Sequence, residues 1–165
     1  MRRTGILVAT MMAALLMVSG VALAKEIQGD AKNNRLVGTE KRDFIYGFGG
    51  DDTINGRGGN DEAYGSQGRD SISGDVGDDE ISGGSANDAV RGGDGNDEVY
   101  GGSGTDNLSG GKGFDYLSGG GGNDTIVSVD GRANDTVSCG PGVDDQVLAD
   151  EDDGVSGDCE RVTRQ

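Results

Sequence analysis

Residues 92–126 read GGDGNDEVYGGSGTDNLSGGKGFDYLSGGGGNDTI. Within this stretch an aspartate returns every nine residues, and an aliphatic residue follows each aspartate by two positions. Counted from Gly29, the chain divides without insertion into eleven consecutive units of nine residues, which end at Val127. Such self-similarity at a fixed period indicates stacked repeats.

Four positions of the unit are nearly constant. Position 1 is always glycine, position 4 is glycine in eight units, position 6 is acidic except in the first unit, which has Asn34, and position 8 is always aliphatic. The position-6 aspartates are Asp43, Asp52, Asp61, Asp70, Asp79, Asp88, Asp97, Asp106, Asp115 and Asp124. The position-8 residues are Leu36, Ile45, Ile54, Ala63, Ile72, Ile81, Val90, Val99, Leu108, Leu117 and Ile126.

Each position has a physical reason. Glycine permits the positive φ values that a tight turn requires over positions 1 to 6. Positions 7 to 9 alternate polar, aliphatic and polar, which predicts a very short strand with one inward face. Two units make one coil of 18 residues, and the coils stack as parallel strands. The sequence therefore predicts an all-β solenoid of five and a half coils, roughly 25 Å long at a strand spacing of about 4.8 Å.

This stacking places carboxylates close together along each edge. They repel one another unless a cation lies between them. The turn offers only aspartate carboxylates and backbone carbonyls, and oxygen-only coordination by a flexible loop suits Ca²⁺ better than Mg²⁺, which needs tighter octahedral geometry. The aspartates are therefore candidate Ca²⁺ ligands.

The first residues have the pattern of an export signal. Arg2 and Arg3 precede an apolar run over residues 6–22, and Ala22-Leu23-Ala24 is a small-x-small cleavage site. We predict a secretory signal peptide over residues 1–24 that is cut after Ala24. The alternative, an uncleaved membrane anchor, is disfavoured because the run is short for a full span. The mature chain, from residue 25, is expected to be secreted or extracellular, with association with the cell surface left open.

Composition excludes several classes of function. Without Arg2 and Arg3 the chain has 12 basic and 30 acidic residues, a net charge of −18, which makes nucleic acid an unsuitable partner. The chain has no histidine, which removes histidine-based triads and most transition-metal sites. It has 34 glycines and no tryptophan, too little for a conventional core. Cys139 and Cys159 lie close together in an exported chain, which favours a disulfide over a metal pair or a reactive thiol.

The unit matches the pattern G-G-x-G-x-D-x-U-x, best seen in residues 92–100 and 119–127. The chain therefore resembles the RTX, or hemolysin-type, calcium-binding repeat proteins. This resemblance implies a parallel β-roll with an ion between turns two units apart. It also implies that carbonyls from the glycine-rich positions complete each site. The candidate glycines are Gly50, Gly59, Gly68, Gly77, Gly95, Gly104, Gly113 and Gly122.

Transferred onto this sequence, the resemblance gives eight candidate sites. The aspartate pairs are Asp43/Asp61, Asp52/Asp70, Asp61/Asp79, Asp70/Asp88, Asp79/Asp97, Asp88/Asp106, Asp97/Asp115 and Asp106/Asp124. Eight Ca²⁺ ions would carry a charge of +16, close to the −18 of the mature chain.

Some units depart from the pattern. Lys32 and Asn34 make residues 25–37 a predicted N-terminal cap that binds no ion, as terminal repeats often do. Lys41 and Arg42 make Asp43/Asp61 the weakest of the eight candidate sites within the repeats of residues 38–127. Ala86 replaces the glycine of position 4 at some conformational cost, and Ala63 leaves a thin spot in the core.

After Val127 the frame slips by two residues. Two degenerate units are predicted over residues 130–138 and 139–147, with Asp135 and Asp144 at position 6. In this frame Gln146 replaces the aliphatic residue. We interpret residues 128–165 as degenerate repeats followed by a C-terminal cap, tied by the Cys139–Cys159 disulfide.

The sequence predicts an extracellular calcium-binding structural or interaction module. A non-catalytic adhesin or surface-binding module for carbohydrate or cell wall remains an alternative. A carbohydrate-binding stripe would use a set of aromatic residues that face outward in this register, although scattered surface aromatics are the more usual interpretation: Phe44, Tyr46, Tyr64, Tyr100 and Tyr116. RTX repeats often follow a catalytic domain, but only residues 25–28 lie between the leader and the first repeat. An enzyme is therefore not expected.

Overall fold

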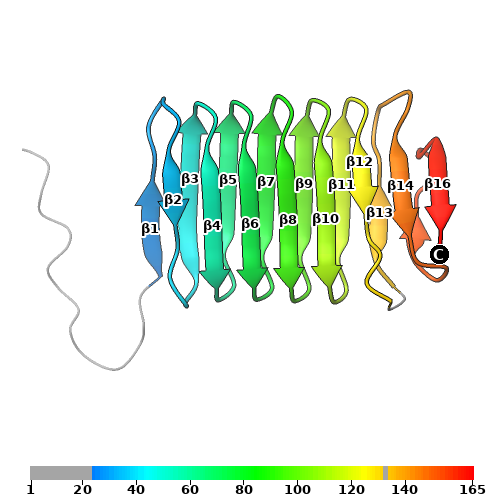
Figure 1. Cartoon of the computed structure of the whole chain (residues 1–165), viewed down its shortest axis with the longest axis horizontal. Coiled ribbons are helices and arrows are strands. Elements are labelled where there is room, and N and C mark those ends of the chain that lie inside the picture. The colour runs from blue at the N-terminus through cyan, green and yellow to red at the C-terminus, as the bar shows by residue number, and fades with distance from the viewer. Residues whose placement is uncertain (1–23, 132–133) are drawn as a thin grey trace, which may run out of the picture.

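The computed structural model describes residues 24–131 and 134–165. Within this part the chain forms sixteen β-strands in two parallel sheets of eight (Figure 1). The predicted leader, residues 1–24, lies outside the described residues except for Ala24. No helix among the described residues is long and apolar enough to cross a membrane.

Odd-numbered and even-numbered strands form separate sheets, because the chain passes from one sheet to the other after each strand. The odd-numbered sheet contains β1 (Lys25–Gln28), β3 (Asp43–Gly49), β5 (Glu62–Gln67), β7 (Glu80–Ser85), β9 (Glu98–Ser103), β11 (Tyr116–Gly121), β13 (Thr136–Ser138) and β15 (Gly154–Val155). The even-numbered sheet contains β2 (Arg35–Val37), β4 (Thr53–Gly58), β6 (Ser71–Val76), β8 (Ala89–Asp94), β10 (Asn107–Lys112), β12 (Thr125–Val127), β14 (Gln146–Ala149) and β16 (Arg161–Arg164).

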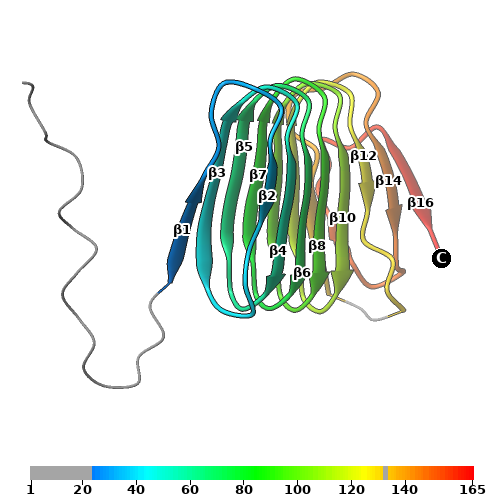
Figure 2. The same cartoon turned by 60° about the vertical axis from the view of Figure 1, so that its left-hand side comes forward.

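The register confirms the coil of 18 residues. Ile45 pairs with Ala63, which pairs with Ile81, and the same step recurs along the regular part of both sheets. The two sheets face each other across a narrow interior, and short turns join them at both edges (Figure 2). The chain is thus a β-roll, as the resemblance implied.

The strands are longer than the sequence predicted. In the regular repeats each covers six residues, from position 7 of one unit to position 3 of the next. Residues at positions 2 and 3 continue the ladder, as in the pairs Phe48–Ser66 and Gly49–Gln67. The turns stack as regularly as the strands do, so part of each turn pairs with the next coil.

Position 8 forms the core. All eleven aliphatic residues of this position are buried, and five of them, including Ile45 and Ile81, have no accessible surface. Ala63 lies between Ile45 and Ile81 in the same column, which confirms the predicted thin spot. The core continues on both sides of the regular repeats, because Ile27, Val137 and Val147 pack against it.

The regular coil continues beyond Val127, and one prediction there is wrong. Val147, not Gln146, pairs with Ile126 and lies in the core, while Gln146 is exposed on the outer face. The turn before β14 is one residue longer than a nine-residue frame allows, and this insertion shifts the strand by one position. With β13 to β16 included, the two sheets make eight coils rather than five and a half, about 34 Å for seven spacings of roughly 4.8 Å.

The predicted disulfide is confirmed. Cys139 and Cys159 are joined by an S–S bond of 2.03 Å, and their Cα atoms are 5.2 Å apart. Cys139 is fully buried and takes the place of the position-1 glycine in its turn, while Cys159 lies one coil further on. The bond therefore ties together the last two turns that lead from the odd-numbered sheet to the even-numbered sheet, the turn after β13 and the turn after β15.

Candidate metal centre

The position-6 aspartates form two buried columns, one along each sheet. In each column the backbone N–H of one aspartate donates to the Oδ1 atom of the aspartate one coil further on, at 2.7–2.9 Å. All ten predicted aspartates take part and are at most 3 % exposed. The aspartate side chain thus accepts the backbone N–H that a carbonyl oxygen would accept in an ordinary parallel ladder. It does so at the position where the chain enters each strand.

The second carboxylate oxygen has no such partner. The Oδ2 atoms of eleven aspartates are buried and accept no hydrogen bond from the described residues. They belong to Asp52, Asp61, Asp70, Asp79, Asp88, Asp97, Asp106, Asp115, Asp124, Asp135 and Asp145. A buried polar group left unpaired costs about 1–3 kcal/mol, so these oxygens need a ligand.

Burial also changes the acidity of these carboxyl groups. Desolvation raises the pKa of Asp61, Asp88 and Asp97 to about 7, from an ordinary value of 3.8. The hydrogen bond from a backbone N–H opposes this rise, and the negative charges of neighbouring aspartates add to it, Asp79 and Asp115 in the case of Asp97. The ionised columns are therefore unfavourable without a counter-charge.

The glycine of position 1 has a different role from the one predicted. Gly47 does not adopt a positive φ. A Cβ atom at Gly47 would lie 2.3 Å from Oδ2 of Asp52 and 2.7 Å from the carbonyl oxygen of Gly65. The glycine is required because the aspartate five residues later occupies the space of its side chain.

Position 4 does adopt the predicted left-handed conformation. Gly122 has a φ of +139°, and an added Cβ would lie 1.5 Å from the carbonyl oxygen of Gly104, one coil earlier. The carbonyl oxygens of position 4 thus point along the stack toward the next turn. The same close approach occurs at Gly68, Gly77, Gly95, Gly104 and Gly113, while at Gly50 and Gly59 a Cβ would approach the carbonyl carbon of Lys32 and of Lys41. Ala86 has a φ of +82°, the strained conformation expected of it.

The carboxylate and carbonyl oxygens of the turns fit a calcium ion. The turns from Asp52 to Asp124 each combine an unpaired carboxylate oxygen with carbonyl oxygens that face the next coil, and all are the hard oxygen ligands that Ca²⁺ prefers. Among the described residues, no three acidic, cysteine or histidine side chains come close enough to form a metal site by themselves. Backbone carbonyls must therefore supply most ligands of any ion held here.

Asp43 differs from the other aspartates. Its Oδ2 accepts hydrogen bonds from the backbone N–H of Thr39 at 2.5 Å and from the Thr39 hydroxyl at 3.0 Å. Because both its oxygens are engaged, Asp43 has less need of a cation than the aspartates above it. Asp43/Asp61 therefore remains the candidate site that we predict to be the weakest.

The structure corrects one site residue and adds others. Asp145, not Asp144, continues the even-numbered column, because its Oδ1 accepts the N–H of Asp124 at 2.7 Å. Asp144 is half-exposed and pairs with Arg161. The predicted Asp135 does continue the other column, above Asp115.

Asp153 and Glu160, which the nine-residue frame missed, end the two columns by accepting the N–H groups of Asp135 and Asp145. A local signal marks all these residues. Asp135, Asp145, Asp153 and Glu160 each precede a valine by two positions, as aspartate precedes the aliphatic residue in the regular unit. The spacing between the ladder residue and the core residue is kept, while the number of residues in the turn varies.

A family comparison agrees with this geometry. The model of the RTX calcium-binding nonapeptide repeat matches residues 28–63, 64–99 and 100–132. These segments cover more than half of the chain, so the chain belongs to the RTX calcium-binding repeat family. The comparison with curated proteins finds no match. Membership implies that Ca²⁺ binds to the repeats.

Proposed function

We propose that this chain is a secreted, non-catalytic repeat protein in which Ca²⁺ ions bridge stacked glycine/aspartate turns and drive folding. The observation that carries this proposal is the set of eleven buried Oδ2 atoms without a hydrogen bond. Ca²⁺ between coils supplies the positive charge that these oxygens lack. The folded roll then acts as a structural or interaction module.

The energetics support the coupling of folding to calcium. At about 1–3 kcal/mol for each unpaired oxygen, the eleven together cost on the order of ten kcal/mol or more. That is comparable to the whole stability of a typical domain, about 5–15 kcal/mol. The core offers one aliphatic side chain per nine-residue unit, and its burial must also offset the conformational entropy that the whole unit loses on folding. A ligand that binds only the folded chain stabilises it by its binding free energy.

The proposed ion sites are the eight pairs from the sequence and two pairs at the C-terminal end, Asp115/Asp135 and Asp124/Asp145. Asp135 and Asp145 support this extension, because they keep both the ladder hydrogen bond and the unpaired oxygen. The leader-like residues 1–24 support secretion, and extracellular fluids supply calcium at the concentrations that such modules need.

Equilibrium dialysis of the purified mature chain against radioactive Ca²⁺ tests the binding proposal. We expect about eight to ten bound ions per chain at saturation, with Mg²⁺ at equal concentration displacing few of them. Binding of fewer than three ions would contradict it. Sequencing of the exported protein tests secretion, and the expected first residue is Lys25.

A further inference from the structure

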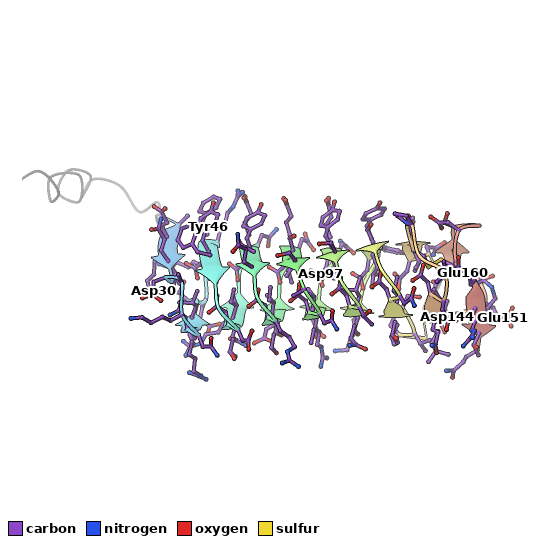
Figure 3. All side chains as sticks on the ribbon, turned by 90° about the horizontal axis from the view of Figure 1, so that it is seen from above. Asp30, Tyr46, Asp97, Asp144, Glu151 and Glu160 are labelled. Carbon is purple, nitrogen blue, oxygen red and sulfur yellow. A yellow bond between two sulfur atoms is a disulfide. The ribbon has the colours of Figure 1, made fainter. Side chains whose placement is uncertain are left out.

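Aromatic side chains lie on one side of the roll only. Six of the seven aromatic residues belong to odd-numbered strands: Phe44, Tyr46, Phe48, Tyr64, Tyr100 and Tyr116. The seventh, Phe114, lies two positions before the first residue of β11, which is also an odd-numbered strand. The even-numbered strands contain no aromatic residue. Tyr46 points away from the interior in a row of ring side chains (Figure 3), and its ring stacks on that of Tyr64 at 5.4 Å.

A row of glutamates runs through the same face. Glu62, Glu80 and Glu98 occupy position 7 in three successive coils and are direct neighbours in the sheet. Like charges placed directly opposite each other destabilise a sheet. The Tyr64 hydroxyl donates to Glu80 at 3.1 Å, and the Tyr100 hydroxyl donates to Glu98 at 2.8 Å. Strands β5, β7, β9 and β11 contain no lysine or arginine.

The first glutamate of the row has a cation from its own chain. Arg42 forms an ion pair and a hydrogen bond with Glu62, and its guanidinium carbon lies 5.1 Å from the centre of the Phe44 ring. Arg42 is at position 5, where the next coils have Asn60, Asp78 and Asn96. Glu80 and Glu98 therefore lack the basic neighbour that Glu62 has, and neither forms a salt bridge with a described residue.

A cavity of about 260 Å³ lies at these three positions. Glu62, Glu80 and Glu98 line it together with Arg42 at one end. Its lining includes Asp61 and Asp79, whose Oδ2 atoms are buried and unpaired. The volume is far above the roughly 30 Å³ of one water molecule, so the cavity has room for a further cation beside the proposed calcium site of Asp61 and Asp79. Its size and charge suit an organic cation.

We infer that this face docks a basic segment of a partner protein, whose arginine side chains pair with Glu80 and Glu98 as Arg42 pairs with Glu62, beside the rings of Tyr64 and Tyr100. Arginine suits the site better than lysine, because a planar guanidinium pairs with a carboxylate through two hydrogen bonds and stacks on aromatic rings. The charge complementarity is strong, since β5, β7 and β9 each present a glutamate, and neither they nor β11 contain a lysine or an arginine. This role goes beyond calcium binding, which only maintains the fold.

The test uses the calcium-saturated mature protein and a fluorescent, end-blocked hexa-arginine peptide, with hexa-lysine for comparison, at about 0.15 M salt. We expect hexa-arginine to bind at least roughly tenfold more tightly than hexa-lysine. The double variant Glu80→Gln/Glu98→Gln should weaken binding about tenfold or more. The matched double variant Glu40→Gln/Asp51→Asn removes the same charge from exposed positions elsewhere and should change the affinity less than about threefold. Equal weakening by both variants would show non-specific attraction to an acidic protein and overturn the proposal.

Two single substitutions test the same site in opposite directions. Asn60→Arg places an arginine where it can pair with Glu80 as Arg42 pairs with Glu62, so peptide binding should fall about tenfold while the β-rich circular dichroism spectrum is kept. Arg42→Asn opens the Glu62 position and should strengthen peptide binding. Unchanged binding by the folded Asn60→Arg protein would refute the assignment, as would tight binding of a neutral glycan that the arginine does not disturb. Since folding by calcium is measured separately, a negative result leaves the calcium proposal standing.

Discussion

The backbone N–H of Asp97 donates to Oδ1 of Asp115, 18 residues further along the chain, at 2.9 Å. The N–H of Asp79 makes the same bond to Asp97 at 2.9 Å. Asp97 is thus bound to both neighbouring coils, while its Oδ2 atom has no hydrogen bond within the described part of the chain. Each aspartate in the middle of a column is shared by two coils in this way.

This sharing predicts unequal effects along a column. Asp97→Asn keeps an oxygen for the ladder but removes the charge next to both Asp79 and Asp115, so we expect it to abolish two calcium sites. Asp43→Asn should remove one at most, because Thr39 already donates to both oxygens of Asp43. Calorimetric titration of the two variants with Ca²⁺ measures the difference. Equal losses of bound calcium would count against ions shared between stacked coils.

The raised pKa values predict that acid partly replaces calcium. Burial raises the pKa of Asp88 and Asp97 to about 7 in the folded chain without metal, against 3.8 ordinarily. Such a group stabilises the fold fully below pH 3.8, and this contribution is lost as the pH rises through about 7. In chelator, the chain should therefore gain β-structure between pH 8 and pH 5.

Circular dichroism against pH, with sedimentation to exclude aggregates, checks this prediction. Calcium affinity should change in the opposite direction and fall on acidification, because protons compete for the same oxygens. A metal-free chain that is equally unfolded at pH 5 and pH 8 would show that buried aspartates do not oppose its folding.

Much of this arrangement could be predicted from the sequence, because the register follows from local periodicity. Ile81 and Asp97 lie where a nine-residue frame places them, since each unit repeats the same turn. The nine-residue frame failed at Asp145 because it assumes turns of constant length, whereas one turn in the C-terminal part is longer and the contacts between coils are the same. Asp145 must reach the N–H of Asp124 and Val147 must reach Ile126, and the turn before them absorbs the extra residue.

Two other features could not be found by counting. The reason for glycine at position 1 is the side chain of an aspartate five residues away, which fills the space of a Cβ atom. From the sequence, Arg42 was expected only to weaken the calcium site of its own turn, but in the structure it forms a salt bridge with Glu62 in the next coil. That partnership depends on how coils stack, which a single unit does not reveal.

The contact at position 1 predicts a contrast between two glycines. A Cβ atom at Gly92 would lie 2.3 Å from Oδ2 of Asp97, whereas one at Gly121 meets nothing within 4 Å. Gly92→Ala should destabilise the calcium-loaded roll by about 1–3 kcal/mol through overpacking, and Gly121→Ala should be close to neutral. Thermal unfolding in saturating Ca²⁺ compares them. A similar loss in both variants would mean that glycine acts through flexibility alone.

The disulfide predicts a local effect of reduction. Cys139 and Cys159 are 20 residues apart, and closing a loop of this size stabilises a fold by up to about 3 kcal/mol. In the Cys139→Ser/Cys159→Ser variant the last coils should loosen, and calcium affinity should fall around Asp124 and Asp145. Coils near Asp61 should be unaffected, because each repeat contacts only its neighbours.

Hydrogen exchange followed by mass spectrometry resolves the two regions. Faster exchange in β12 to β16 with unchanged exchange in β3 to β7 is the expected result. Uniform acceleration along the chain would contradict a local tie, and unchanged exchange everywhere would remove any role of the disulfide in holding the final coils.

If calcium binding and folding are one process, a calcium titration of the mature chain followed by circular dichroism will show both together. The mature chain in excess chelator at pH 7.5 should show little β-structure, and about 1–10 mM Ca²⁺ should convert it to a β-rich form in one cooperative transition. Mg²⁺ at the same concentration should leave the spectrum unchanged. A β-rich spectrum that is already complete in chelator would contradict the account.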